Sequence, residues 1–168
     1  RKSLDLSVIM TAAISQVREF LELDRLVVYK FDEPTLKSLN TNGLVKHYSH
    51  QNSHQNLQNS PPFYGCVVHE VLANDTISSV LNYSEEKCLM PSTKCWQKYR
   101  QGFTLAVSDV EKTYVFEKCL LKYLKDIQVK AKFAAPIVFE EKLWGLLIAH
   151  QCHTTHEWTQ SEQILLTS

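Results

Sequence analysis

The chain carries a thiol and an ammonium group at a spacing that could bring them to one site. In the stretch EKCLLKYLKDIQVKAKF, Cys119 lies in the apolar stripe of a predicted amphipathic helix, and Lys132 lies on the polar face of the strand predicted to follow. A thiol can bond covalently to a ligand, and an ammonium disfavours a second positive charge beside it. Taken alone, the spacing favours the simpler interpretation, in which Cys119 only packs in the core.

A second cluster contains side chains that zinc accepts as ligands. The stretch HQCHTTH places four of them close together, namely His150, Cys152, His153 and His156. Cys66 and His69 are three apart, so in a strand they point to opposite faces, and HQCHTTH lacks the paired spacing of a zinc ribbon. A cysteine hydrolase built from Cys119 and a histidine has no supporting motif either, and there is no Gly-x-Ser-x-Gly elbow or glycine-rich phosphate loop. The spacing therefore disfavours a metal or hydrolytic centre.

The charge balance favours a small or uncharged partner. The 168 residues include 18 Lys plus Arg and 18 Asp plus Glu, so no field of one sign attracts nucleic acid or an anionic membrane. No apolar run approaches the roughly 20 residues that span a bilayer. Five cysteines are an odd number in a chain of ordinary core size, which favours free thiols and a cytoplasmic location.

Periodicity predicts a single α+β domain with one mostly antiparallel sheet and helices on its faces. A strand at 143–152 is apolar on both faces, as a central strand would be. Thr159 with Glu162 three residues later predicts a capping box for the last helix, whose pattern stops midway and indicates a domain from a longer protein. Helices are predicted at 4–23 and 93–102, and a helical turn at 76–81. A further helix is predicted to begin at a capping box of Ser108 and Glu111 and to end near 126. The predicted strands cover 25–31, 63–72, 103–109, 129–139 and 143–152, and 39–62 is predicted to be a long loop insertion.

Three motifs give the chain a resemblance to a known family. The runs DRLVVYKF, YRQG and QVKAKFAAPIVFEEKLWGLLIAHQC together resemble the bilin-binding GAF domains of cyanobacteriochromes, light sensors related to phytochromes. The resemblance covers nearly the whole chain, and it implies a single GAF photosensory domain over 1–168.

The resemblance implies that Cys119 attaches a linear tetrapyrrole through a thioether. Most members have histidine after this cysteine, whereas this chain has Leu120. A subset that resembles green/red sensors combines such a leucine with a lysine in the next strand, here Lys132, and with a glutamate upstream, here Glu86 or Glu85. A carboxylate favours a protonated bilin and an ammonium disfavours it, so light could change colour by changing protonation.

The remaining site residues also follow from the resemblance. They are Tyr99 and Arg100 in YRQG, with Arg100 on a propionate, Tyr123 and His150 in the pocket wall, and Phe103, Trp96 and His150 near the moving ring. Cys88 lies where many members carry a second cysteine; it could add to the central methine bridge, hold the A ring in place of Cys119, or only pack.

The implied function is that of a photoreceptor module without catalytic residues. It would bind phycocyanobilin, or alternatively biliverdin, isomerise it between 15Z and 15E, and signal to an output domain such as a histidine kinase, with a homodimer as one possible assembly. The alternative is a GAF domain that binds another small ligand, such as a cyclic nucleotide, or that only mediates dimerisation.

Overall fold

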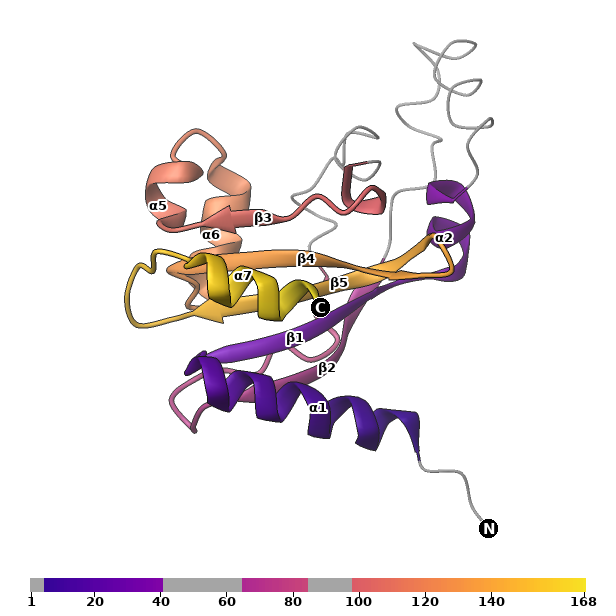
Figure 1. Cartoon of the computed structure of the whole chain (residues 1–168). Coiled ribbons are helices and arrows are strands. Elements are labelled where there is room, and N and C mark those ends of the chain that lie inside the picture. The colour runs from indigo at the N-terminus through magenta and orange to yellow at the C-terminus, as the bar shows by residue number, and fades with distance from the viewer. Residues whose placement is uncertain (1–4, 41–64, 85–97) are drawn as a thin grey trace, which may run out of the picture.

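The fold is one five-stranded antiparallel sheet with helices on both faces, in the strand order β2-β1-β5-β4-β3 (Figure 1). The computed structural model describes residues 5–40, 65–84 and 98–168. Its elements are α1 (Leu6–Leu21), β1 (Arg25–Phe31), α2 (Glu33–Leu39), β2 (Gly65–Leu72), β3 (Leu105–Val107), α5 (Val110–Thr113), α6 (Lys118–Asp126), β4 (Ala131–Phe139), β5 (Lys142–Gln151) and α7 (Gln160–Thr167). The predicted α+β class with an antiparallel sheet is confirmed.

The prediction of a central strand is confirmed by β5, which pairs with β1 on one side and β4 on the other. Its alternate residues enter two separate apolar clusters, since Ile148 packs in one and Ala149 in the other. The first cluster includes Leu120 and Leu124 of α6. We call this side of the sheet the α6 face.

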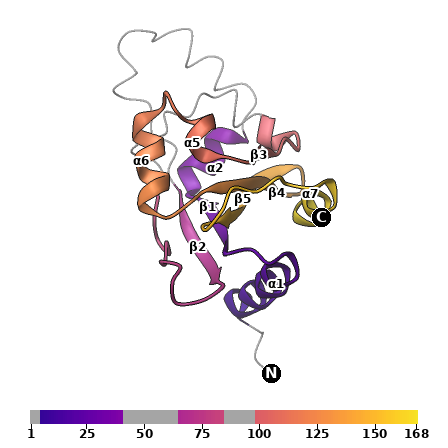
Figure 2. The ribbon, with the colours of Figure 1, turned by 90° about the vertical axis from the view of Figure 1, so that its left-hand side faces the viewer.

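The opposite side of the sheet carries the two terminal helices, α1 and α7. Ile14 of α1 and Leu166 of α7 pack in the second cluster together with Trp158, whose indole N–H donates to the carbonyl of Val107 at 3.1 Å. We call this side the terminal-helix face. Figure 2 shows α6 on one side of the sheet and α1 and α7 on the other.

Local capping explains where several helices begin. The side chain of Asp5 accepts from the backbone of Ser7 to start α1, and the predicted capping box of Thr159 and Glu162 is present at α7. Asp32 caps α2 by accepting from the backbone of Thr35. The stretch DEPT therefore begins a helix as well as closing the strand.

The prediction of one continuous helix that ends near 126 is wrong. Two short helices, α5 and α6, are separated by a turn in which Val115 and Phe116 are 51% and 94% exposed. Their apolar side chains continue the helical spacing in sequence, but they do not reach the core. The cap is Asp109 rather than Ser108, because the Asp109 carboxylate accepts from the backbone of Glu111 and Lys112.

The predicted helical turn at 76–81 is also wrong, because this stretch forms non-helical turns held by side chains. The Glu70 carboxylate accepts from the backbone of Val80 at 2.8 Å, and the Gln128 amide bonds Ser78 and Thr76.

Of the predicted loop at 39–62, residue 39 ends α2 and 41–62 lie outside the described residues. The strands are close to the predicted ranges. β1 has the predicted bounds, β3 is shorter by four residues, β4 is shorter by two, and β5 is shifted by one. β2 begins at Gly65, and 63–64 lie outside the described residues. In the parts of the chain that the structure describes, no helix is long and apolar enough to cross a membrane.

Gly145 permits the close approach of β5 to β1. A Cβ at this position would lie 2.2 Å from the carbonyl oxygen of Tyr29, and the backbone cannot move away without breaking the ladder. We expect Gly145→Ala to lower the free energy of unfolding in urea by about 3 kcal/mol, at the upper end of overpacking costs. Gly102→Ala is the control, because a Cβ there meets nothing within 4 Å and only the φ of +96° is strained, which costs about 1 kcal/mol. Equal losses in the two variants would contradict the contact with Tyr29.

Candidate functional site

The α6 face carries three buried polar side chains amid apolar residues. Arg25, Lys132 and His150 are 0%, 7% and 3% exposed, and they come from β1, β4 and β5. They lie side by side because His150 is the register partner of both Arg25 and Lys132. Basic groups in an apolar wall need hydrogen-bond or charge partners, since burying an isolated charge costs free energy.

The Arg25 guanidinium donates hydrogen bonds to three acceptors. Its Nε donates to His150 Nδ1 at 3.0 Å, and its two terminal nitrogens donate to the carbonyls of Ser78 at 2.8 Å and Ile127 at 2.6 Å. Burial lowers the pKa of Arg25, and neighbouring groups, Cys152 and Glu70 foremost, partly oppose this.

His150 is held neutral and retains one unused polar atom. Burial, followed by the charges of Arg25 and Lys132, holds the pKa of His150 well below its ordinary value. Its Nε2 is buried and has no hydrogen-bond partner among the described residues. A buried polar atom without a partner is rare in a native structure, and Nε2 is free to bond a ligand that reaches it.

Lys132 is the register partner of His150 in β4, and its ammonium lies over an aromatic ring. Its ammonium is 5.2 Å from the ring centroid of Tyr114, a cation–π contact. None of the ion pairs among the described residues involves Lys132. Glu86 and Glu85, predicted as the matching carboxylate, lie outside the described residues.

The predicted attachment residue stands at the start of α6. Cys119 is exposed, while the next residue, Leu120, is 7% exposed and packs in the cluster on the α6 face. Cys119 is disulfide-bonded, whereas Cys66 and Cys152 are free. The expectation of free thiols is therefore wrong for Cys119, because an odd number of cysteines does not exclude one bridge.

Two other predicted site residues pack in the cluster on the α6 face. Tyr123 is half-buried against the cluster, and Tyr99 is 8% exposed within it. Phe103, predicted near the moving ring, is 42% exposed and forms a T-shaped contact with the Tyr99 ring at a centroid distance of 5.5 Å. Arg100 is half-buried in the same short helical turn as Tyr99. Cys88 and Trp96 lie outside the described residues.

The histidine-rich stretch does not form one cluster. His153 Nδ1 lies 3.2 Å from the Asp24 carboxylate and His156 Nε2 lies 2.9 Å from Glu162, while His150 points to the α6 face with Arg25. Burial raises the pKa of the Cys152 thiol to about 11, which makes it a poor metal ligand. Over residues 5–40, 65–84 and 98–168, no three His, Cys, Asp or Glu side chains are placed to hold a metal ion.

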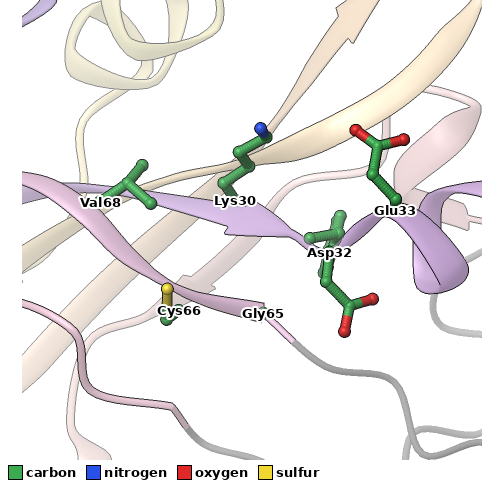
Figure 3. Close-up of a pocket in the computed structure, with 7 residues that line it drawn as sticks. Lys30, Asp32, Glu33, Gly65, Cys66 and Val68 are labelled. Atoms are coloured by element: carbon green, nitrogen blue, oxygen red, sulfur yellow. The ribbon is translucent and has the colours of Figure 1, made fainter. Parts of the chain in front are cut away.

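A cleft of about 440 Å³ lies elsewhere, where β1 and β2 meet the start of α2 (Figure 3). Its described lining residues are Lys30, Phe31, Asp32, Glu33, Gly65, Cys66 and Val68, and none of them is a predicted site residue. Val68 packs with the cluster on the terminal-helix face, and the Lys30 ammonium lies 5.5 Å from the ring centroid of Trp144 in that same cluster. Phe31 belongs to the cluster on the α6 face, but none of the three basic side chains of that face lines the cleft.

Arg25 and Tyr114 are the site residues that sequence reasoning missed. Arg25 begins a strand whose alternate residues Val27, Tyr29 and Phe31 are buried in the cluster on the α6 face, and this alternation assigns Arg25 to the same face. Tyr114 left no such signal, because it lies in the unpredicted turn between α5 and α6.

Comparison with known proteins places this geometry in a family. Residues 5–168 match the family model described as GAF domain. The chain is 39% identical over 169 residues to the circadian input-output histidine kinase CikA of Synechocystis, covering 99% of this chain and 21% of that protein. The chain thus spans about a fifth of the length of the curated relatives it matches first.

Solved structures extend the likeness to the whole fold. The cyanobacteriochrome receptor PixJ, determined in dark and illuminated states, matches 96% of this chain and 87% of its own with a TM-score of 0.68 and 25% identity. A far-red absorbing domain with bound biliverdin matches 98% of this chain and 84% of its own with a TM-score of 0.70, and at 19% identity this likeness concerns the fold alone. The chain therefore belongs to the GAF domain family, with the fold of the cyanobacteriochrome GAF domains.

Proposed function

We propose that this domain binds a linear tetrapyrrole, a bilin, on its α6 face and serves as a light-sensing module. The observation that carries the proposal is the likeness of nearly the whole chain to the cyanobacteriochrome receptor PixJ. The arrangement on the α6 face fits such a ligand, because this face combines the apolar side chains of Leu120 and Leu124 with a buried polar atom, His150 Nε2, that has no hydrogen-bond partner among the described residues. When bound, the bilin would supply light absorption and 15Z/15E isomerisation.

Cys119 would hold the bilin by adding its S–H across a double bond of the A-ring side chain, with no leaving group. A thioether needs a thiol, and Cys119 is disulfide-bonded. Attachment therefore requires a thiol reductant that supplies two electrons and two protons to the disulfide first. Cys88 remains the second candidate for a bond to the pigment.

Lys132 and a carboxylate, Glu86 or Glu85, would set the protonation of the pigment in opposite directions. An ammonium held in the wall by Tyr114 disfavours a cationic ligand close to it, and a carboxylate favours one. Arg100, Tyr99 and Tyr123 would complete the binding wall, with Arg100 on a propionate.

The output would be carried by α1 and α7, which pack on the opposite face of the sheet. The similarity to the histidine kinase CikA supports a kinase elsewhere in the full-length protein as the responding domain, with this domain itself not catalytic. We propose a cytoplasmic location and phycocyanobilin as pigment, with biliverdin as the alternative and a homodimer as one possible assembly.

The direct test is the absorption spectrum of the chain produced with a phycocyanobilin pathway and, separately, with biliverdin alone. We expect a visible or far-red band that interconverts reversibly between two forms under saturating light. The pigment that loads better identifies the native class. Colourless protein from both strains would reject the proposal and leave a GAF domain for another small ligand.

Cys119→Ser should abolish covalent attachment of the pigment. The measurement is pigment fluorescence of the denatured protein band after acid treatment, which retains thioethers and releases bound but unattached bilin. The matched controls Cys66→Ser and Cys152→Ser each remove a thiol that is free among the described residues, and they should keep the pigment attached. Pigment that stays on the Cys119 variant would move the attachment to another cysteine, with Cys88 tested next.

Lys132→Met should raise the apparent pKa of the bound pigment by on the order of one unit, because it removes a nearby positive charge. The absorbance of both photostates would be followed against pH. Lys122→Met is the control, since the Lys122 side chain is 80% exposed and pairs with Asp126 on the outer side of α6. Identical titrations for Lys132→Met and the wild type would remove Lys132 from the colour mechanism.

A further inference from the structure

Arg25 joins three separate parts of the fold through one buried guanidinium. From the first position of β1 it reaches the imidazole of β5, the carbonyl of Ser78 in the segment after β2, and the carbonyl of Ile127. Ile127 is the residue that ends α6, where the helix leaves partial negative charge on its carbonyls. The guanidinium therefore fixes the end of the helix that carries Cys119 relative to His150.

The hydrogen bond between Arg25 and His150 has a definite direction. A guanidinium nitrogen can only donate, so His150 Nδ1 must present its lone pair at 3.0 Å. A neutral imidazole carries one proton, and with Nδ1 unprotonated this proton resides on Nε2. The protonated atom is the one that lacks a partner among the described residues.

We propose that Arg25 is a positioning residue that fixes His150 as the Nε2–H tautomer, so that the site presents a hydrogen-bond donor and selects a ligand with an acceptor oxygen. The tautomer is a property of the protein alone. The identity of the acceptor, a carbonyl or carboxylate oxygen of a bilin, rests on the proposed function.

The charges around the pair are consistent with this role. Lys132 of β4 faces His150 from the other side, and its positive charge also favours the neutral ring. Asp24, Glu70, Cys152 and Tyr123 act on Arg25 electrostatically. No ion pair of the described residues joins Arg25 to a carboxylate. Among the described residues, His150 is the one side chain to which Arg25 donates, since its other two acceptors are the carbonyls of Ser78 and Ile127.

The test is long-range ¹H–¹⁵N NMR of the ¹⁵N-histidine-labelled chain, with and without bilin, between pH 6 and pH 8. We expect the His150 nitrogens to show a protonated Nε2 and an unprotonated Nδ1 throughout. A protonated Nδ1, or an imidazolium at neutral pH, would overturn the proposal. The tautomer of His150 can be measured in the pigment-free chain as well. A wrong prediction of the tautomer is therefore distinguishable from a failure of the chain to bind a bilin.

Two substitutions of Arg25 separate the effect of its hydrogen-bond donor from the effect of its positive charge. In Arg25→Gln the amide nitrogen takes the place of Nε and can still donate, whereas Arg25→Met places a methyl group there. Both remove the positive charge, so both should raise the pKa of His150, but only the Met variant should populate the Nδ1–H tautomer. The same tautomer in both variants would contradict the positioning role.

Arg18→Met is the control, because Arg18 also donates to a carbonyl, that of Leu23 at 2.9 Å, but from α1 on the terminal-helix face. It should leave the His150 signals unchanged. If Arg25→Met does not fold, the tautomer of the wild type and of Arg25→Gln decides the matter. Loss of the Nε2–H tautomer in Arg25→Gln would then contradict the proposal that a hydrogen-bond donor at residue 25 fixes the tautomer of His150.

Discussion

The position of β5 between β1 and β4 is the constraint on which the other elements depend. A strand that is buried on both faces needs a covering layer on each side, and helices pack on both sides of this sheet. Gly145 lets β1 approach closely enough to pair, and the alternating side chains of β5 supply both apolar clusters. The α6 face and the terminal-helix face are two consequences of one strand.

The α6 face combines this apolar covering with an unusual concentration of basic side chains. Arg25 is satisfied by two carbonyls and an imidazole, Lys132 by the ring of Tyr114, and His150 on one of its two nitrogens. Burial makes each of these contacts stronger than it would be in water, and it also makes a missing partner more costly. These features underlie our proposal that the α6 face binds a mostly apolar ligand that brings a hydrogen-bond acceptor to His150.

Much of the fold follows from the sequence because local signals and burial agree. The two-sided apolar pattern of β5 and the capping box of α7 were predictable for this reason. Val115 and Phe116 continue a helical apolar pattern yet lie in an exposed turn, since tertiary packing overrides periodicity there. The disulfide of Cys119 was not predictable, because a sequence does not give the distance between two sulfurs. The hydrogen bond of Arg25 to His150 joins residues 125 positions apart, so only the folded chain reveals it.

The two faces of the sheet share one backbone, and this limits how the domain can transmit a change. Ala149 and His150 are consecutive in β5, with Ala149 packed beside the terminal helices and His150 beside α6. A strand that slides or twists to accommodate a new contact at the imidazole must carry its neighbour with it. The pleat of β5 would then act as a mechanical coupling, in which a small displacement on one side changes the packing on the other.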